Sequence, residues 1–147
     1  MENELDRVVD ASPAMTDAQR AVRSLIMRSL VSVVDDDEST RESLPDLLRE
    51  FGFVARTFSS AEGFLASDYV GQTRCLVLDI SMPGMSGPDL QRELMRRRQE
   101  IPIIFITAHK DETVRRRVLE QGAVECLFKP FSDTALLKAV NAALRVS

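Results

Sequence analysis

The chain has 147 residues, of which 44% are hydrophobic, and its formal net charge is −4 at pH 7. This length suits one domain with its own core and leaves little room for a second. The negative charge argues against a nucleic-acid-binding surface over the whole domain, and no apolar run reaches the length of a membrane span. Cys75 and Cys126 lie inside apolar runs without C-x-x-C spacing, which is typical of reduced thiols. We therefore expect a soluble cytoplasmic protein.

Residues 1–28 differ in pattern from the rest of the chain, and we expect them to form a leader before a domain of residues 29–147. Thr16 and Gln19 have the spacing of a capping box. The apolar residues that follow them recur at helical intervals and predict a short amphipathic helix: Val22, Leu25, Ile26 and Leu30. Three interpretations stay open: a leader packed loosely on the domain, sequence upstream of an internal start such as Met27, and a partner-binding helix.

From Leu30 onward, apolar strands and amphipathic helices alternate in five strand–helix pairs. The predicted strands are short apolar runs: LVSVV (30–34), FVART (53–57), CLVLD (75–79), IPIIFIT (101–107) and AVECLFK (123–129). The predicted helices have apolar residues on one face: 37–52, 59–68, 86–100, 111–121 and 132–145. Apolar strands between amphipathic helices indicate a parallel sheet with both faces covered. The sequence therefore predicts an α/β fold.

Local signals refine the ends of these helices. Ser59 and Glu62 have capping-box spacing at the start of the second predicted helix. Gly52 and Gly122 close the first and fourth predicted helices. Pro45 falls inside the first predicted helix, where we expect it to kink the helix or to shift its start.

Polar side chains follow four of the five predicted strands, at the point where each strand ends. They are Asp35, Asp36 and Asp37 after the first strand, Asp79 at the end of the third, Thr107 at the end of the fourth and Lys129 at the end of the fifth. In an open parallel sheet, ligands bind outside the carboxyl ends of the strands, and neighbouring strands lie roughly 4.8 Å apart. We therefore expect these groups to converge on a ligand the size of a phosphoryl group.

Each of these residues also has a simpler interpretation. The acidic run from Asp35 can complement a helix dipole, an effect of roughly 0.3–1 kcal/mol, Thr107 can cap a helix, and Lys129 can be a surface charge. Asp79 is harder to explain in this way, because an acid after a buried strand is costly unless something compensates it. Two carboxylates about 4 Å apart repel by roughly 4 kcal/mol at an effective dielectric near 20. A cation is therefore expected, and hard oxygen ligands without a nearby His or Cys favour Mg²⁺ over zinc.

Four motifs occur in order along the chain: VVDDD (33–37), LVLDISMPGMSG (76–87), IIFITAH (103–109) and FKPF (128–131). Together they resemble the receiver domain of two-component response regulators over residues 29–145. The residues of these motifs are most similar to those of the FixJ-like class. The resemblance implies a flavodoxin-like (βα)5 three-layer sandwich, with a five-stranded parallel sheet of order 2-1-3-4-5.

The resemblance also implies roles for the polar strand ends. Asp79 would be the phosphoacceptor and a ligand of Mg²⁺. Asp36 would bind the metal directly, Asp35 would assist through metal-bound water, and the carbonyl of Ser81 would be a further ligand. Thr107 would hydrogen-bond one phosphoryl oxygen.

Lys129 would pair with another phosphoryl oxygen, and the Lys129–Pro130 bond is usually cis in this family. The implied protein is a signalling phosphoacceptor, not a metabolic enzyme: it catalyses only its own phosphorylation and dephosphorylation. Its phosphodonor would be a sensor histidine kinase. Its switching face would be the fourth helix, the fifth strand and the fifth helix, where a homodimer or an effector protein would bind. The chain itself would contact neither nucleic acid nor a membrane.

Two residues depart from the usual pattern of the family. Cys126 occupies a switch position that is usually aromatic, and we hypothesise that Phe128, on the same side of the strand, substitutes in part. Ser81 lacks the amide or carboxylate that often orients attacking water, which predicts slow to moderate self-dephosphorylation.

Two other classes of protein compete with this interpretation. A phosphate-independent pseudo-receiver that only docks partners is the alternative, and the intact polar strand ends argue against it. A small phosphohydrolase would need a second acid where Ser81 stands. The chain ends after the last predicted helix without a helix-turn-helix, so we expect it either to work alone or to be the receiver part of a longer regulator.

Overall fold

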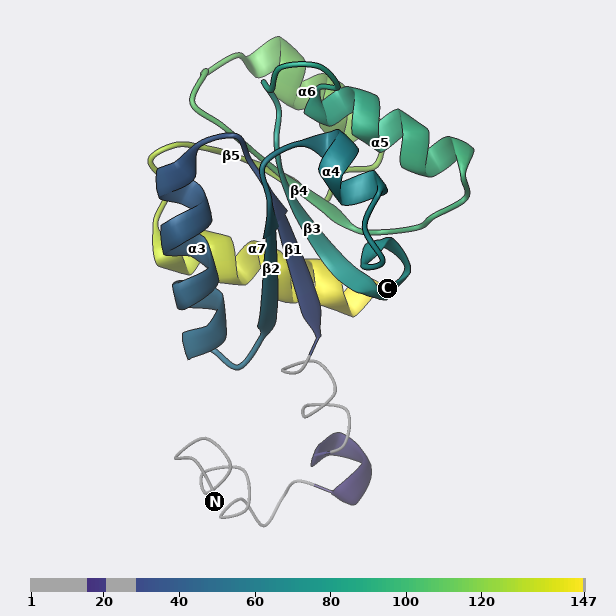
Figure 1. Cartoon of the computed structure of the whole chain (residues 1–147). Helices are drawn as coiled ribbons and strands as arrows, with labels where there is room; N and C mark the ends of the chain where they lie inside the picture. The colour runs from purple at the N-terminus through teal and green to yellow at the C-terminus, as the bar shows by residue number, and fades with distance from the viewer. Residues whose placement is uncertain (1–15, 21–28, 147) are drawn as a thin grey trace.

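The computed structural model describes residues 16–20 and 29–146, and its strands form one five-stranded sheet of order β2-β1-β3-β4-β5 (Figure 1). The strands are β1 (Leu30–Val34), β2 (Val54–Phe58), β3 (Thr73–Asp79), β4 (Ile103–Thr107) and β5 (Glu125–Phe128). All four neighbouring pairs are parallel. The predicted flavodoxin-like strand order is confirmed.

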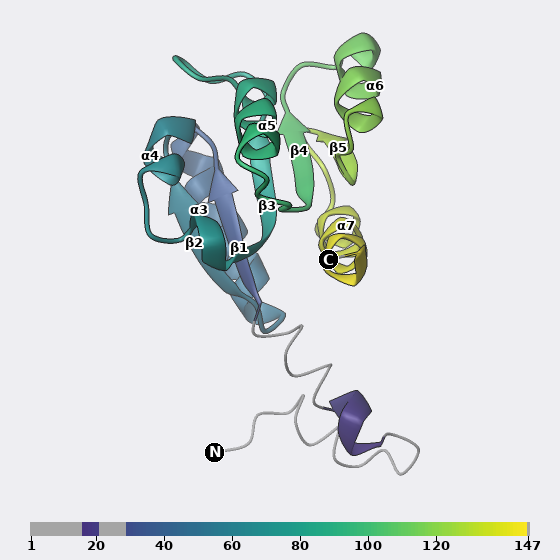
Figure 2. The ribbon, with the colours of Figure 1, turned by 90° about the vertical axis from the view of Figure 1, so that its right-hand side faces the viewer.

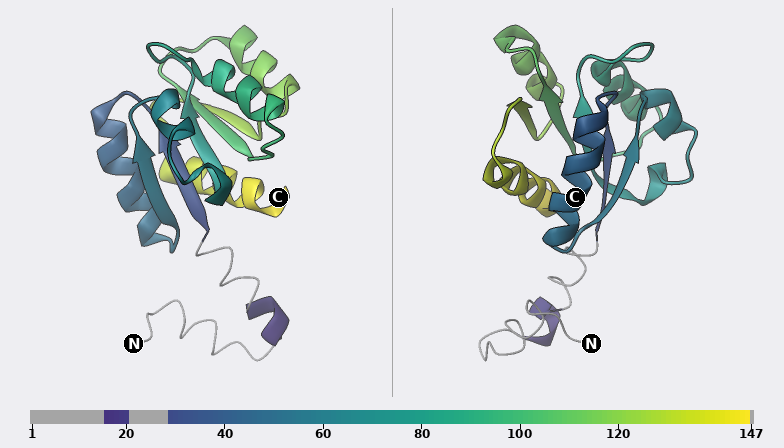
Figure 3. Two further views of the ribbon diagram at one scale, coloured as in Figure 1. Left: turned by 45° about the vertical axis from the view of Figure 1, so that its right-hand side comes forward. Right: turned by 60° about the vertical axis from the view of Figure 1, so that its left-hand side comes forward.

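The helices cover both faces of the sheet (Figures 1 and 2). They are α3 (Glu38–Glu50), α4 (Ala61–Leu65), α5 (Gly87–Arg96), α6 (Glu112–Glu120) and α7 (Asp133–Val146), with a short 3-10 turn η1 (Val70–Gln72) before β3. Helices α3 and α7 lie on one face, and α4, α5 and α6 lie on the other, as the two views of Figure 3 also show. Among the helices in the described ranges, none is long and apolar enough to cross a membrane.

Each face of the sheet has its own hydrophobic core. On one face, Val31 and Val33 of β1 pack with Leu48 of α3 and Leu136 of α7. The core on the opposite face contains residues of β3 and of all three covering helices: Leu76, Leu78, Phe64, Leu90, Leu94 and Val118. All five residues of β4 are buried. This is why the central strands read as continuous apolar runs, and their burial holds the carboxyl ends of the strands in fixed positions.

The helix starts agree with the sequence in one place and differ in another. Helix α3 begins at Glu38 after the N-cap Asp37, and it runs through Pro45, so the proline does not shift its start. The predicted capping box of Ser59 and Glu62 is wrong. Ser60 is the N-cap of α4, and its Oγ accepts a hydrogen bond from the Gly63 N–H at 3.0 Å.

In residues 16–20, the predicted capping box is present. The Thr16 N–H donates to Gln19 Oε1 at 2.8 Å, and the Gln19 N–H donates to Thr16 Oγ1 at 3.1 Å. The remainder of the predicted helix, residues 21–28, lies outside the described residues, and Leu30 belongs to β1 and not to this helix.

Candidate functional site

Three carboxylates meet at the carboxyl ends of β1 and β3. Asp35, Asp36 and Asp79 each place one oxygen within 4.8 Å of the others. Asp35 and Asp79 are buried, with exposed fractions of 0% and 6%, whereas Asp36 is exposed. β1 and β3 are adjacent, and Val34 is in register with Leu78, so the residue after each of these two positions reaches the same point. Such close acids repel one another unless positive charge or protons compensate them.

Lys129 brings the ammonium group of the site. Its Nζ donates to Asp35 Oδ2 at 2.7 Å and to Thr40 Oγ1 at 3.2 Å, and it lies 3.9 Å from Asp37 Oδ2. The other oxygen of Asp35, Oδ1, accepts the Asp37 N–H at 2.9 Å. Both oxygens of the Asp35 carboxylate are therefore engaged by the protein itself. The Lys129–Pro130 bond after this lysine is cis, as the resemblance implies.

The negative charge of the cluster contributes to a raised pKa of Asp79. Burial, together with the negative charge of Asp35, raises the pKa of Asp79 from 3.8 to about 7, and the Lys129 ammonium opposes this only in part. Asp79 therefore holds a proton through much of the range where a free aspartate is ionised. One ammonium does not neutralise three carboxylates, and a further cation would stabilise the ionised form of Asp79.

The donor set fits a hard divalent cation. The oxygens that converge here are carboxylates, which suit Mg²⁺ in number and type. Asp36 is exposed and can approach an ion from the solvent side. Ser81 is also exposed and adjoins the cluster, with its N–H 3.4 Å from Asp79 Oδ1.

Thr107 completes the group of polar strand ends. It is buried at the end of β4, and its Oγ1 accepts the His109 N–H at 3.1 Å. Asp79 is in register with Ile106, so Thr107 stands one residue beyond the aspartate on the neighbouring strand. The Lys129 N–H donates to the Thr107 carbonyl at 2.8 Å, which ties the last two strand ends together. The polar strand ends named in the sequence analysis thus lie at one edge of the sheet.

The loop after Asp79 is held at several points. At its base, the Gly87 N–H donates to the Ile80 carbonyl at 3.0 Å, and the side chain of Met82 is buried in the core. At its tip, Glu62 Oε2 of α4 accepts the Met85 N–H at 3.0 Å. Glu62 was not among the predicted site residues, because this contact joins segments 23 residues apart and no spacing rule connects them.

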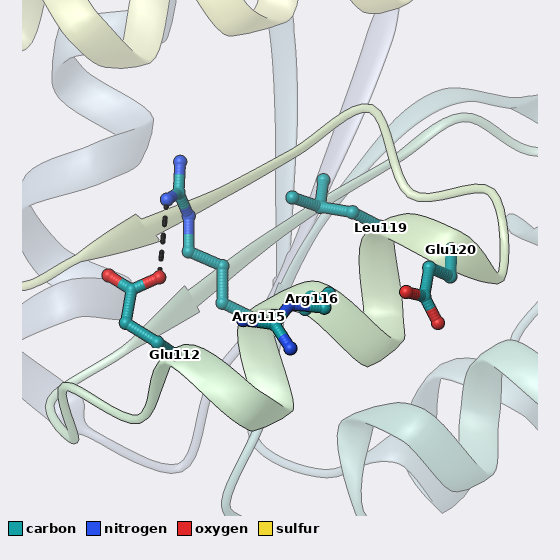
Figure 4. A pocket seen from close by; sticks show the side chains of 5 residues that line it. All are labelled: Glu112, Arg115, Arg116, Leu119 and Glu120. Atoms are coloured by element: carbon teal, nitrogen blue, oxygen red, sulfur yellow. Dashed lines mark ion pairs between the residues drawn. The ribbon is translucent and has the colours of Figure 1, made fainter.

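A second unpredicted residue, Arg115 of α6, contacts β5. Its Nε donates to the Cys126 carbonyl at 3.3 Å, its Nη2 lies 3.4 Å from Glu125 Oε1, and its guanidinium lies 5.8 Å from the centre of the Phe128 ring. Figure 4 shows Arg115 beside Glu112, with which it forms an ion pair of 3.5 Å. The pocket drawn in Figure 4 is lined by residues of α6 alone. Cys126 and Phe128 pack on the same core, so both point to the α4–α6 face.

Comparison with known proteins agrees with this geometry. The family model of the response regulator receiver domain matches residues 31–141. Nodulation protein W of Bradyrhizobium diazoefficiens is 48% identical over 116 residues, which are 79% of this chain and 51% of that protein. The chain spans about half the length of the curated relatives that it matches.

Solved structures give the same result. The response regulator StyR is 48% identical with a TM-score of 0.75, over 81% of this chain and 60% of that one. FixJ-N is 39% identical with a TM-score of 0.72, over 80% of this chain and 94% of that one. The chain therefore belongs to the response regulator receiver domains and is FixJ-like in its motifs and in the FixJ proteins that it matches.

Proposed function

We propose that the chain accepts a phosphoryl group on Asp79 from a sensor histidine kinase, as part of a cytoplasmic two-component system. The supporting observation is the cluster of Asp35, Asp36 and Asp79, in which one ammonium leaves negative charge uncompensated and the pKa of Asp79 rises to about 7. This arrangement is costly in a resting protein and useful where a cation and a phosphoryl group bind.

Asp36, Asp79 and the carbonyl of Ser81 would hold Mg²⁺, with Asp35 assisting through metal-bound water. The engagement of both Asp35 oxygens by Lys129 and Asp37, beside the exposure of Asp36, favours this division of roles. When bound, the ion would offset the negative charge of the phosphoryl oxygens.

In the transfer itself, one Asp79 oxygen attacks phosphorus in line with the bond to the donor. The new O–P bond forms while the N–P bond of the kinase phosphohistidine breaks, and the leaving imidazole keeps the electron pair and takes up a proton from water. The Lys129 ammonium and the Thr107 hydroxyl donate hydrogen bonds to phosphoryl oxygens. Thr107 already accepts a bond from the His109 N–H, and accepting does not use its own proton.

The output would leave through the face of α6, β5 and α7, where a homodimer or an effector protein would bind. Thr107 precedes α6 and is tied to Lys129 at the end of β5, so a movement of Thr107 toward a phosphoryl group would reach both elements. Because Cys126 stands at the usual aromatic position, Phe128 would carry part of the response.

The test is the intact mass of the protein after incubation with acetyl phosphate and Mg²⁺, beside an Asp79→Asn variant. We expect one phosphoryl adduct that needs the metal and is absent from the variant. No adduct, under conditions that label another receiver domain, would refute the proposal and favour a pseudo-receiver that acts without phosphate.

A further inference from the structure

We propose that Glu62 of α4 is a positioning residue, which fixes the loop of residues 80–86 so that the Ser81 carbonyl faces the metal site. This inference rests on the proposed function and assigns to that site a residue from outside the polar strand ends. It concerns the tip of the loop, where the chain turns from β3 toward α5.

Glu62 lies on a helix, α4, that is held in place by packing and by an N-cap. Phe64, two residues later, is fully buried, and its ring meets that of Phe58 edge-on at 5.3 Å between centroids. Ser60 caps the helix through the Gly63 N–H. Because the cap is provided by Ser60, the Glu62 carboxylate is not used locally and instead accepts the Met85 N–H at 3.0 Å. A hydrogen bond from a backbone N–H to a carboxylate is stronger than one between neutral groups.

The rest of the loop explains why this contact matters. At its base the Gly87 N–H donates to the carbonyl of Ile80, the residue after β3, and Met82 is anchored in the core. Pro83 and Gly84, which lie between Met82 and Gly87, are exposed. The Glu62–Met85 bond holds this exposed turn. Through the turn it would also restrict the backbone before Met82, where Ser81 lies.

Gly84 gives a second observation that the turn and the Glu62 side chain fit together in space. Its φ is +74°, which favours glycine, and a Cβ at this position would lie 2.5 Å from Glu62 Oε2. The carboxylate thus occupies the space that any other residue at position 84 would need. An alanine there would push the flexible end of Glu62 away and break its bond to Met85.

The experiment compares Glu62→Ala and Glu62→Gln in the full chain, with Glu50→Ala as a control. Glu50 is an exposed acid at the far end of α3 from the site, so it controls for the loss of one negative charge. Two quantities are measured: the hydrogen-exchange rate of the Met85 amide in EDTA by NMR, and the Mg²⁺ dissociation constant by calorimetry.

For Glu62→Ala we expect faster Met85 exchange and weaker Mg²⁺ binding, each by about threefold to tenfold, the effect of one lost hydrogen bond. Glu62→Gln keeps an oxygen acceptor but loses the negative charge, so it should lie between wild type and Glu62→Ala in both quantities. Gly84→Ala should also accelerate Met85 exchange, both through backbone strain at its positive φ and through loss of the Glu62 bond. Adding Glu62→Ala to it should therefore accelerate exchange less than Glu62→Ala does in wild type.

Unchanged Met85 exchange in Glu62→Ala, or an equal effect of Glu50→Ala on Mg²⁺ affinity, would overturn the inference. Faster exchange with unchanged Mg²⁺ affinity would also overturn it, because Glu62 would then hold the turn without serving the metal site. Failure of the proposed function has a different signature: wild type itself would bind no Mg²⁺ and form no adduct. In that case the link from Glu62 to a metal site falls as well, whatever the exchange rates are.

Discussion

Replacing Asp79 with asparagine is expected to stabilise the metal-free protein, and to do so more at pH 8 than at pH 5. Asp79 is 6% exposed and lies beside Asp35, and burial together with this negative charge raises its pKa from 3.8 to about 7. An acid with a raised pKa binds its proton more tightly in the folded state. The folded state therefore loses stability as the pH rises from the unfolded pKa, 3.8, to the folded one, about 7.

The size of the effect follows from the two pKa values. A difference of about three pKa units corresponds to ~4 kcal/mol above pH 7, and structural relaxation makes this an upper value. Asparagine has the same shape and no charge, so it avoids the cost at every pH. At pH 5 the folded wild type keeps its proton while the unfolded chain has lost most of its own, so part of the cost is already present. The advantage of Asp79→Asn should grow by about 2–3 kcal/mol between pH 5 and pH 8.

Urea unfolding of both proteins in EDTA at pH 5, 6, 7 and 8 measures this directly, with Asp68→Asn as a matched control at an exposed aspartate. Mg²⁺ at pH 8 should then stabilise wild type more than Asp79→Asn, because the ion binds the folded carboxylate. An advantage of asparagine that does not change with pH, or a variant less stable than wild type at pH 8, would refute the reasoning.

Further predictions concern the residues around Asp79. Lys129→Met should lower the free energy of unfolding at pH 7 by ~3–5 kcal/mol, because it leaves the buried Asp35 carboxylate without its ammonium; a loss below about 1 kcal/mol in urea unfolding would contradict this. Thr107→Ala should still form the adduct on acetyl phosphate but lose the phosphorylation-dependent change in hydrogen exchange of α6, which Thr107→Ser should restore; a normal response of the alanine variant would argue against a role for the hydroxyl. Ser81→Asn should shorten the lifetime of the phosphorylated protein severalfold in a mass time course, since the amide can orient water, and rapid loss of phosphate from wild type would contradict the slow to moderate rate expected. Phe128→Ala should weaken phosphorylation-dependent dimerisation or partner binding, measured by light scattering or pull-down. Unchanged binding would show that Phe128 does not take the place of an aromatic residue at position 126.

The sequence predicts the strands well because their apolar runs are long and buried on both faces. Helix ends depend on backbone conformation, and sequence signals them unevenly. Helices α3 and α6 end next to Gly52 and Gly122, both with positive φ, and a glycine there is a readable signal. Helix α5 ends at Arg96, four residues before its predicted end, because Arg98 adopts a φ of 58° and its neighbours close the helix with the same type of backbone hydrogen bonds. An arginine in this conformation is uncommon, so no residue type at this position signals the end of the helix.

In the site, too, one part can be predicted and another cannot. The strand order predicts where the polar residues lie, but it does not predict which partner each side chain bonds to. Asp79 and Thr107 end their strands, and Asp35 and Lys129 directly follow theirs. A parallel sheet must bring such positions to one edge. The partner of each side chain is not fixed by this rule. Lys129 could have bonded to Asp79, but it bonds to Asp35 at 2.7 Å, and its charge lowers the raised pKa of Asp79 only in part.

Glu62 illustrates the same limit. Its spacing from Ser59 fits a local capping box, yet a neighbouring serine takes the cap and the carboxylate reaches a loop 23 residues away. Local sequence patterns predict hydrogen-bond partners only within one turn of a helix. A side chain bonds instead to a residue distant in sequence when the fold places an unpaired N–H within reach. The residues that carry charge at this site are therefore visible in the sequence, while the residue proposed to position them is visible only once β3, α4 and the loop between β3 and α5 are placed together.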